Sequence, residues 1–86
     1  MTLEKFVKTR QFLFWSVDPE KLHLLNPEAV VETILNYGDW DDVQTLIKIL
    51  GIKRVAKIFQ KQISNWRTNY DEKIIYYFKR YFNKYA

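Results

Sequence analysis

Two stretches with a helical hydrophobic period flank Gly51 and organise the middle of the chain. Their apolar residues recur every three or four positions, namely Trp40, Val43, Leu46, Ile47 and Leu50 before the glycine, and Ile52, Val55, Ala56, Phe59 and Ile63 after it. This period predicts two helices with one buried side each. Asp39 can cap the first helix, and Gly51 can adopt the left-handed conformation that ends it. The stretch therefore predicts a helical hairpin with a very short turn.

The second helix of this hairpin has a cationic outer side. Lys53, Lys57 and Lys61 fall on one face at intervals of four residues, and Arg54 and Gln60 lie beside them. A tight turn followed by a helix with outward cationic and amide side chains is the pattern that a helix-turn-helix needs to place a helix in the major groove. A helical hairpin with a solvated basic face has the same pattern. Both interpretations stay open at this stage.

The other apolar patterns predict further helices around the hairpin. Residues 3–9 have a short helical period, and residues 27–37 open with the cap, proline and acid of Asn26-Pro27-Glu28. An unbroken apolar stripe from Ile74 to Tyr85 predicts the last helix. We expect the central hairpin to lie between the 27–37 helix and this last helix.

Two segments lack a clear period. Residues 12–15 form a continuous apolar tetrad, which we expect to be buried whatever its backbone conformation. Residues 64–70 are rich in capping residues, which predicts a loop. The predicted core contains Phe14, Trp15, Ile34, Trp40, Leu46, Leu50, Val55, Phe59, Ile74, Phe78 and Phe82.

Length and composition limit the fold class. The 86 residues make one domain, 1–86, whose core buries about 60 to 65% of the unfolded surface. A hydrophobic content of 48% excludes a disordered chain, and two glycines with two prolines are too few for a many-stranded β fold. We therefore predict a small all-α domain of four or five helices with a helix-turn-helix-like central hairpin. The lack of cysteine, of an apolar run of about 18 residues and of a secretory signal predicts a cytoplasmic protein that does not enter the membrane.

Charge is distributed unevenly along the chain. Residues 1–43 hold four basic and eight acidic side chains, a net charge of −4, whereas residues 44–86 hold ten basic and two acidic side chains, a net charge of +8. Such asymmetry indicates an anionic partner for the C-terminal half, either nucleic acid or an acidic protein surface. In the alternative interpretation, the two halves fold against each other and neutralise their charges.

The chemistry of catalysis is missing from the sequence. There is no glycine-rich phosphate loop, His23 is the single histidine, and no spacing of Asp, Glu and His suits a metal ion. His23 is expected to be an ordinary surface or boundary residue. We therefore predict a protein that is not an enzyme, with no catalytic residues, metal or cofactor.

Two binding functions remain. In the first, the protein binds nucleic acid, most simply duplex DNA, with Lys53, Lys57, Gln60 and Lys61 facing the groove and Arg54, Arg67, Lys73, Arg80 and Lys84 near phosphates. In the second, the protein docks on a protein partner, with anchors supplied by Trp66, Tyr70, Tyr76 and Tyr77.

Two motifs carry a family resemblance. Residues 12–22 read Phe-Leu-Phe-Trp-Ser-Val-Asp-Pro-Glu-Lys-Leu, and residues 34–43 contain a helix end at Gly38 followed by an acidic turn with Trp40. They resemble a family of short bacterial proteins with an FLFWDVDPEKL-type opening, over about residues 12–62. Ser16 stands where members of that family tend to have Asp. Those members look like antitoxin-type companions, often encoded just ahead of nucleotidyltransferase toxins of the abortive-infection kind. The resemblance implies a toxin–antitoxin or phage-defence role with a partner toxin, and it transfers no functional residue, because the matched motifs look structural.

Overall fold

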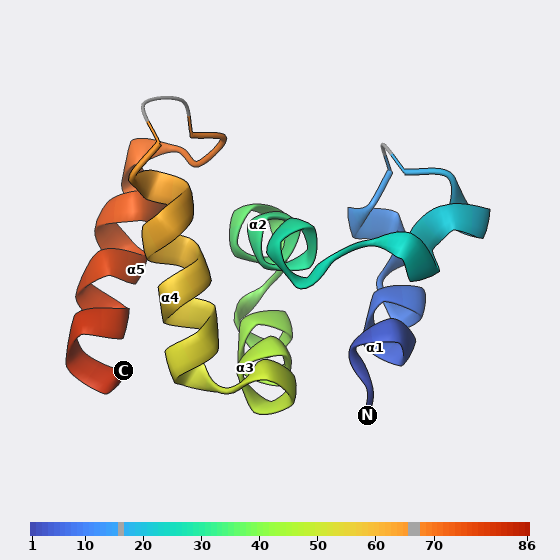
Figure 1. Ribbon diagram of the computed structural model, residues 1–86, viewed down its shortest axis with the longest axis horizontal. Helices are drawn as coiled ribbons and strands as arrows, with labels where there is room; N and C mark the ends of the chain where they lie inside the picture. The colour runs from blue at the N-terminus through green and yellow to red at the C-terminus, as the bar shows by residue number, and fades with distance from the viewer. Residues whose placement is uncertain (16, 66–67) are drawn as a thin grey trace.

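A computed structural model describes residues 1–15, 17–65 and 68–86. Within these residues the chain is helical and contains no strand. Its elements are α1 (Leu3–Thr9), the 3-10 helices η1 (Gln11–Leu13) and η2 (Pro19–Leu24), α2 (Pro27–Tyr37), α3 (Trp40–Leu50), α4 (Ile52–Ile63) and α5 (Glu72–Tyr85) (Figure 1). The predicted all-α fold is confirmed, and the helices expected over 3–9 and 27–37 have the predicted bounds.

Side-chain caps explain where the middle helices begin. Asn26 Oδ1 accepts a hydrogen bond from the backbone N–H of Ala29 at 2.8 Å, directly before Pro27 opens α2. Asp39 Oδ1 accepts from the backbone N–H of Asp42 at 2.9 Å, and Asp42 Oδ2 accepts in return from the backbone N–H of Asp39 at 3.1 Å. These bonds satisfy N–H groups that have no partner within the helix. The predicted starts of α2 and α3 are therefore confirmed.

The helix α4 lies between α5 on one side and α2 and α3 on the other (Figure 1). It packs against α2, α3 and α5, while α1 packs against α3 and η2 at the far end of the molecule. Figure 1 shows α4 and α5 side by side, running in opposite directions. Phe59 of α4 is fully buried, and its ring centroid lies 5.1 Å from that of Tyr70, 6.0 Å from Phe78 and 5.6 Å from Phe82. This aromatic cluster fixes α5 against α4.

Most of the predicted core is buried. The confirmed members are Phe14, Ile34, Leu46, Val55, Phe59, Phe78 and Phe82. Leu50 and Ile74 are partly buried and pack against these residues.

The predictions for two tryptophans are wrong. Trp15 is 75% exposed, because the 3-10 turn before it directs Phe14 inward and leaves Phe12 and Trp15 outside. Trp40 is 45% exposed, because it occupies the first position of α3 at the edge of the core. Its ring stands edge-on against Tyr77 and Tyr81 of α5, with centroid distances of 6.1 and 5.3 Å. Trp40 therefore links two helices at the surface.

A partly buried ion pair attaches the N-terminal segment to α3. Arg10 Nε donates a hydrogen bond to Asp42 Oδ1, and the Asp42 side chain is almost fully buried. The hydrogen bond and the charge of Asp42 raise the pKa of Arg10 above its ordinary value, so the guanidinium stays charged. Asp42 thus serves both the cap of α3 and the contact with Arg10.

Two glycines, Gly38 and Gly51, flank α3, and each position requires glycine for a different structural reason. Gly51 has φ of +89°, a backbone conformation that side chains with a Cβ rarely adopt, and a Cβ added there would meet no atom within 4 Å. Gly38 has an ordinary φ of −74°, but an added Cβ would lie 2.8 Å from the carbonyl oxygen of Ile34. The α3–α4 turn consists of Gly51 alone, which is shorter than the usual turn of about three or four residues in a helix-turn-helix.

Candidate nucleic-acid interface

The outer side of α4 is cationic along its whole length. We call this surface the cationic ridge and define it as Lys53, Arg54, Lys57, Gln60 and Lys61. All five residues are exposed, because the opposite side of α4 is fixed in the core. Within the described part of the chain, the salt bridges join Glu4 to Lys8 and Arg10 to Asp42, so they leave the ridge cations unpaired. Four positive charges on one helix face form a strong anion-attracting surface.

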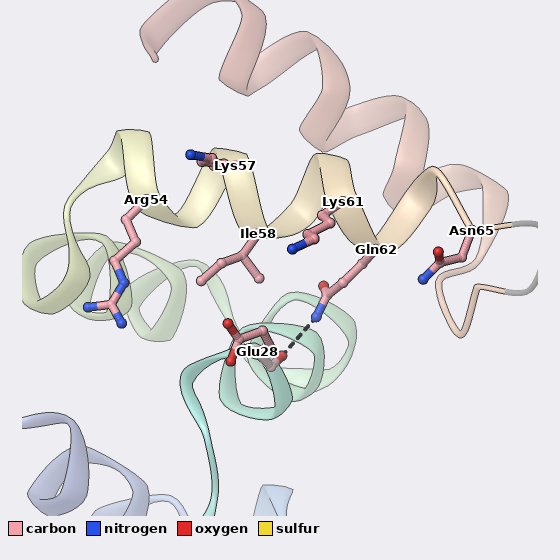
Figure 2. Close-up of a pocket in the computed structure, with 7 residues that line it drawn as sticks. All are labelled: Glu28, Arg54, Lys57, Ile58, Lys61, Gln62 and Asn65. Carbon is pink, nitrogen blue, oxygen red and sulfur yellow. Dashed lines mark hydrogen bonds between the residues drawn. The ribbon is translucent and has the colours of Figure 1, made fainter.

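A groove separates the ridge from the first turn of α2. This α2–α4 groove has a volume of about 490 Å³ and is lined by Glu28, Arg54, Lys57, Ile58, Lys61, Gln62 and Asn65. Figure 2 shows Arg54, Ile58 and Lys61 extending from α4 on the side that faces α2. Gln62 Nε2 donates a hydrogen bond to the backbone carbonyl oxygen of Glu28 at 2.9 Å, which fixes the two helices together at the groove floor. The groove is open and rich in cations, with the carboxylate of Glu28 opposing them.

A second groove borders the ridge on its other side. This α4–α5 groove has a volume of about 580 Å³, and its residues are Phe59, Gln60, Ile63, Ser64, Lys79, Arg80, Phe82 and Asn83. Three of these side chains are hydrophobic and belong to the α4–α5 packing, whereas Lys79 and Arg80 are exposed and add positive charge. The ridge therefore stands between two grooves that both contain cations. A convex helix with cationic flanks has the shape that fits between the phosphates of a major groove.

A third groove lies on the far side of α5. We call it the aromatic groove; it has a volume of about 710 Å³ and is lined by Trp40, Tyr76, Tyr77, Arg80, Tyr81, Asn83, Lys84 and Tyr85. Arg80 Nη1 donates a hydrogen bond to the hydroxyl of Tyr76 at 2.8 Å, and its guanidinium lies 5.4 Å from the centre of that ring. Lys84 Nζ lies 5.3 Å from the centre of the Tyr85 ring. The cations of this groove are therefore held against its aromatic rings.

The predicted nucleic-acid residues do not form one surface. The five ridge residues lie together, Arg80 lines both grooves that flank α5, and Lys84 lines the aromatic groove. Lys73 is exposed in the first turn of α5 and lines none of the three grooves, and Arg67 lies outside the described residues. Lys79 was missed as a site residue. Its outward position followed from the helical period, but its place opposite Gln60 depends on how α5 packs against α4.

The predicted partner anchors are also divided. Tyr76 and Tyr77 are 64% and 50% exposed, and Trp66 lies outside the described residues. Tyr70, predicted as a partner anchor, is buried and does not fit that role: its ring packs on Phe59, and its hydroxyl donates a hydrogen bond to Gln62 Oε1. Burial, with a smaller effect from the charge of Glu32, raises the pKa of Tyr70 well above its ordinary value. The segment around residue 70 folds back onto α4, which no local sequence pattern indicated.

Features of other classes of site were sought in the same residues. In the part of the chain that the structure describes, no group of three His, Asp or Glu side chains is placed to hold a metal ion. Likewise, none of the described helices is long and apolar enough to cross a bilayer. The described residues form a small helical domain with a cationic surface.

The sequence also places the chain in a family. The profile of DUF6922, a family of unknown function, matches residues 9–59. This match covers more than half of the chain, and the protein belongs to that family. The matched part runs from the end of α1 to Phe59 in α4 and so includes three of the four cations of the ridge. No curated protein and no solved structure matches the chain.

Proposed function

We propose that this protein binds duplex DNA through the cationic ridge of α4 and is not an enzyme. The observation that carries the proposal is the ridge itself, an exposed helix face with four cations that form no salt bridge with the residues that the structure describes. Open grooves that contain cations border it on both sides. Neutralising phosphates and releasing their counterions provides most of the affinity in such a contact.

We expect the residues of this surface to have different roles. Lys57 and Gln60 lie on the exposed outer side of α4, from which long side chains can reach base edges in the major groove. Arg54 and Lys61 line the α2–α4 groove together with Lys57, and Arg80 lines the α4–α5 groove on the other side together with Gln60. We therefore expect these flanking cations to contact the two phosphate backbones and to set the position of the helix.

The first test is the dependence of affinity on salt. With about five phosphates neutralised, the logarithm of the association constant falls against the logarithm of salt concentration with a slope of about −4 to −5. Fluorescence anisotropy with a labelled duplex of about two helical turns provides the measurement. Affinity that does not change with salt, or no binding at low salt, would reject the proposal.

The second test reverses charge on the ridge. Lys57→Glu with Lys61→Glu is expected to remove most duplex affinity and to reduce the salt slope by about 2, because two attractive contacts become repulsive. The free energy of unfolding is expected to change by only about 0.5 kcal/mol or less per site, since both residues are exposed.

The matched control reverses the same amount of charge elsewhere. Lys5 and Lys21 are exposed on α1 and η2, away from the three grooves. The variant Lys5→Glu with Lys21→Glu has the same net charge as the ridge variant and is expected to retain most of the affinity. If the two variants lose affinity equally, net charge alone explains binding and the ridge is not the site.

We propose a bacterial toxin–antitoxin or phage-defence setting for this activity. The basis is the resemblance of residues 12–22 and 34–43 to antitoxin-type companions. The genes adjacent to this one test the setting directly, because a neighbouring nucleotidyltransferase toxin is expected. A pull-down with and without nuclease tests the partner: a protein that stays bound after nuclease treatment would indicate docking on a toxin, the alternative function.

A further inference from the structure

The aromatic groove is a separate surface that the cationic ridge does not use. Four of its rings are exposed large side chains, those of Trp40, Tyr76, Tyr77 and Tyr85. Trp40, Tyr77 and Tyr85 belong to one contact network, since Trp40 stands edge-on to Tyr77 and Tyr81, and Tyr81 contacts Tyr85 at a centroid distance of 4.9 Å. Tyr76 is held by Arg80, which donates a hydrogen bond to its hydroxyl. The rings are thus held in place by neighbouring side chains of the groove, while part of each remains open to solvent.

We propose that the aromatic groove binds single-stranded DNA. Unpaired bases stack on aromatic side chains whatever their sequence, because every base has a π face, and interleaved cations hold the backbone. The groove offers this combination, with Arg80 and Lys84 set among the rings and no carboxylate in its described lining.

The charges around the groove orient the strand. Arg80 and Lys84 lie on α5, whereas Trp40 lies at the start of α3 beside the exposed carboxylates of Asp39 and Asp41. Phosphates are attracted to the α5 side and repelled from the α3 side. The backbone therefore runs along Arg80 and Lys84, and the bases point toward Trp40.

The choice of DNA comes from the position of the groove beside the ridge. Arg80 and Asn83 line both the aromatic groove and the α4–α5 groove. A single strand in the aromatic groove therefore lies next to a duplex on the ridge. An unpaired end of that duplex has the same position relative to the paired part. The choice of DNA over RNA rests on the proposed duplex binding, but the stacking surface itself does not.

The test uses a labelled oligothymidylate of about 12 nucleotides, with binding measured by fluorescence anisotropy. Trp40→Leu with Tyr77→Leu keeps the charge and much of the apolar area but removes two stacking faces. We expect the affinity for the oligonucleotide to fall about tenfold or more, because each stacked base depends on its aromatic partner. The affinity for duplex DNA is expected to stay within about twofold of the parent, since the ridge is unchanged.

Two further variants make the comparison secure. Tyr76→Leu with Tyr85→Leu removes the two rings of the groove that are most exposed, and is the second arm if the first variant has a lowered melting temperature. Trp15→Leu with Tyr37→Leu removes two exposed rings outside the groove and is expected to bind the oligonucleotide as the parent does.

The outcomes separate this proposal from the preceding one. Oligothymidylate affinity that is unchanged in both aromatic variants, or lowered equally in the control, would overturn it. Loss of oligothymidylate affinity in the variant Lys57→Glu with Lys61→Glu to the same extent as duplex affinity would place the strand on the ridge and also overturn it.

Tighter binding of an oligouridylate would reject DNA as the occupant, and displacement of the oligonucleotide by a Glu-rich peptide at equal or lower concentration would favour a protein partner. The two proposals can also fail separately. If Lys57→Glu with Lys61→Glu leaves duplex affinity unchanged while the aromatic variants lose oligothymidylate affinity, the duplex proposal fails and this proposal is supported.

Discussion

Asp42 combines two tasks in one buried carboxylate. One oxygen accepts from Arg10, and the other accepts from the backbone N–H of Asp39 at the start of α3. Asp42→Ala is therefore expected to destabilise the protein by about 1–3 kcal/mol, because two donors lose their acceptor. The measurement is urea unfolding followed by circular dichroism. Asp41→Ala, an exposed change in the same helical turn, is the control and is expected to cost less than about 1 kcal/mol.

Tyr70 gives stability a dependence on alkaline pH. In the folded protein its pKa is raised by burial, whereas in the unfolded chain the hydroxyl ionises near its ordinary pKa of 10.0. The folded state thus holds its proton more tightly, and the stability that this provides is complete below about pH 10 and is lost as pH rises above it. We expect the melting temperature of Tyr70→Phe to fall less steeply with pH than that of the parent. The pH range to compare is about pH 9 to pH 11, which extends about one pH unit on each side of the ordinary tyrosine pKa. Parallel curves would show that Tyr70 does not cause the loss.

Glu28 opposes the proposed DNA contact. Its carboxylate lines the α2–α4 groove with Arg54 and Lys61, where a phosphate is expected to lie. Glu28→Gln keeps the size of the side chain, and its backbone carbonyl remains free to accept from Gln62. We expect this variant to bind duplex DNA about two- to tenfold more tightly at low salt, because a repulsive charge is removed. Weaker binding would show that phosphates do not follow this groove.

At the scale of elements, the two glycines around α3 are expected to respond differently to alanine. Gly51→Ala is expected to cost about 1–3 kcal/mol, because alanine must adopt a positive φ in open space. Gly38→Ala brings its Cβ against the Ile34 carbonyl oxygen and within 3.0 Å of the Asp42 Cβ, so it displaces the cap of α3. A double-mutant cycle with Asp42→Ala checks this: the Gly38 effect is expected to be coupled to Asp42 and the Gly51 effect to be additive.

Helix boundaries were predictable because they depend on neighbours in sequence. The signals at Asn26-Pro27, Asp39 and Gly51 act within one helical turn, and the structure uses each of them. The surroundings of Trp15 and Tyr70 were not predictable, because burial at the end of a 3-10 turn or in a loop depends on which helix the segment meets. The same limit applies to the grooves of the candidate site. The ridge follows from the period of α4, but the sequence does not say which side of α5 faces it.

At the scale of the molecule, α5 lies outside the family match but completes the core. Phe78 and Phe82 cover Phe59, the aromatic residue of α4. A chain that ends at residue 70 is therefore expected to lose cooperative unfolding, because a domain of this size buries only just enough apolar surface to be stable. Circular dichroism during heating measures this, and a chain that lacks only residues 85 and 86 is the control. A truncated chain with a sharp transition near that of the parent would show that residues 1–70 fold without α5.

The order of packing in this molecule also affects how quickly it forms. Each of α2, α3 and α4 packs against the helix that follows it along the chain, so the central contacts join segments that are close in sequence. Closing short loops requires little conformational search, and helical proteins with such local contacts fold in microseconds to milliseconds. The cationic ridge, the proposed DNA-binding surface, is therefore restored within about that time after each unfolding event.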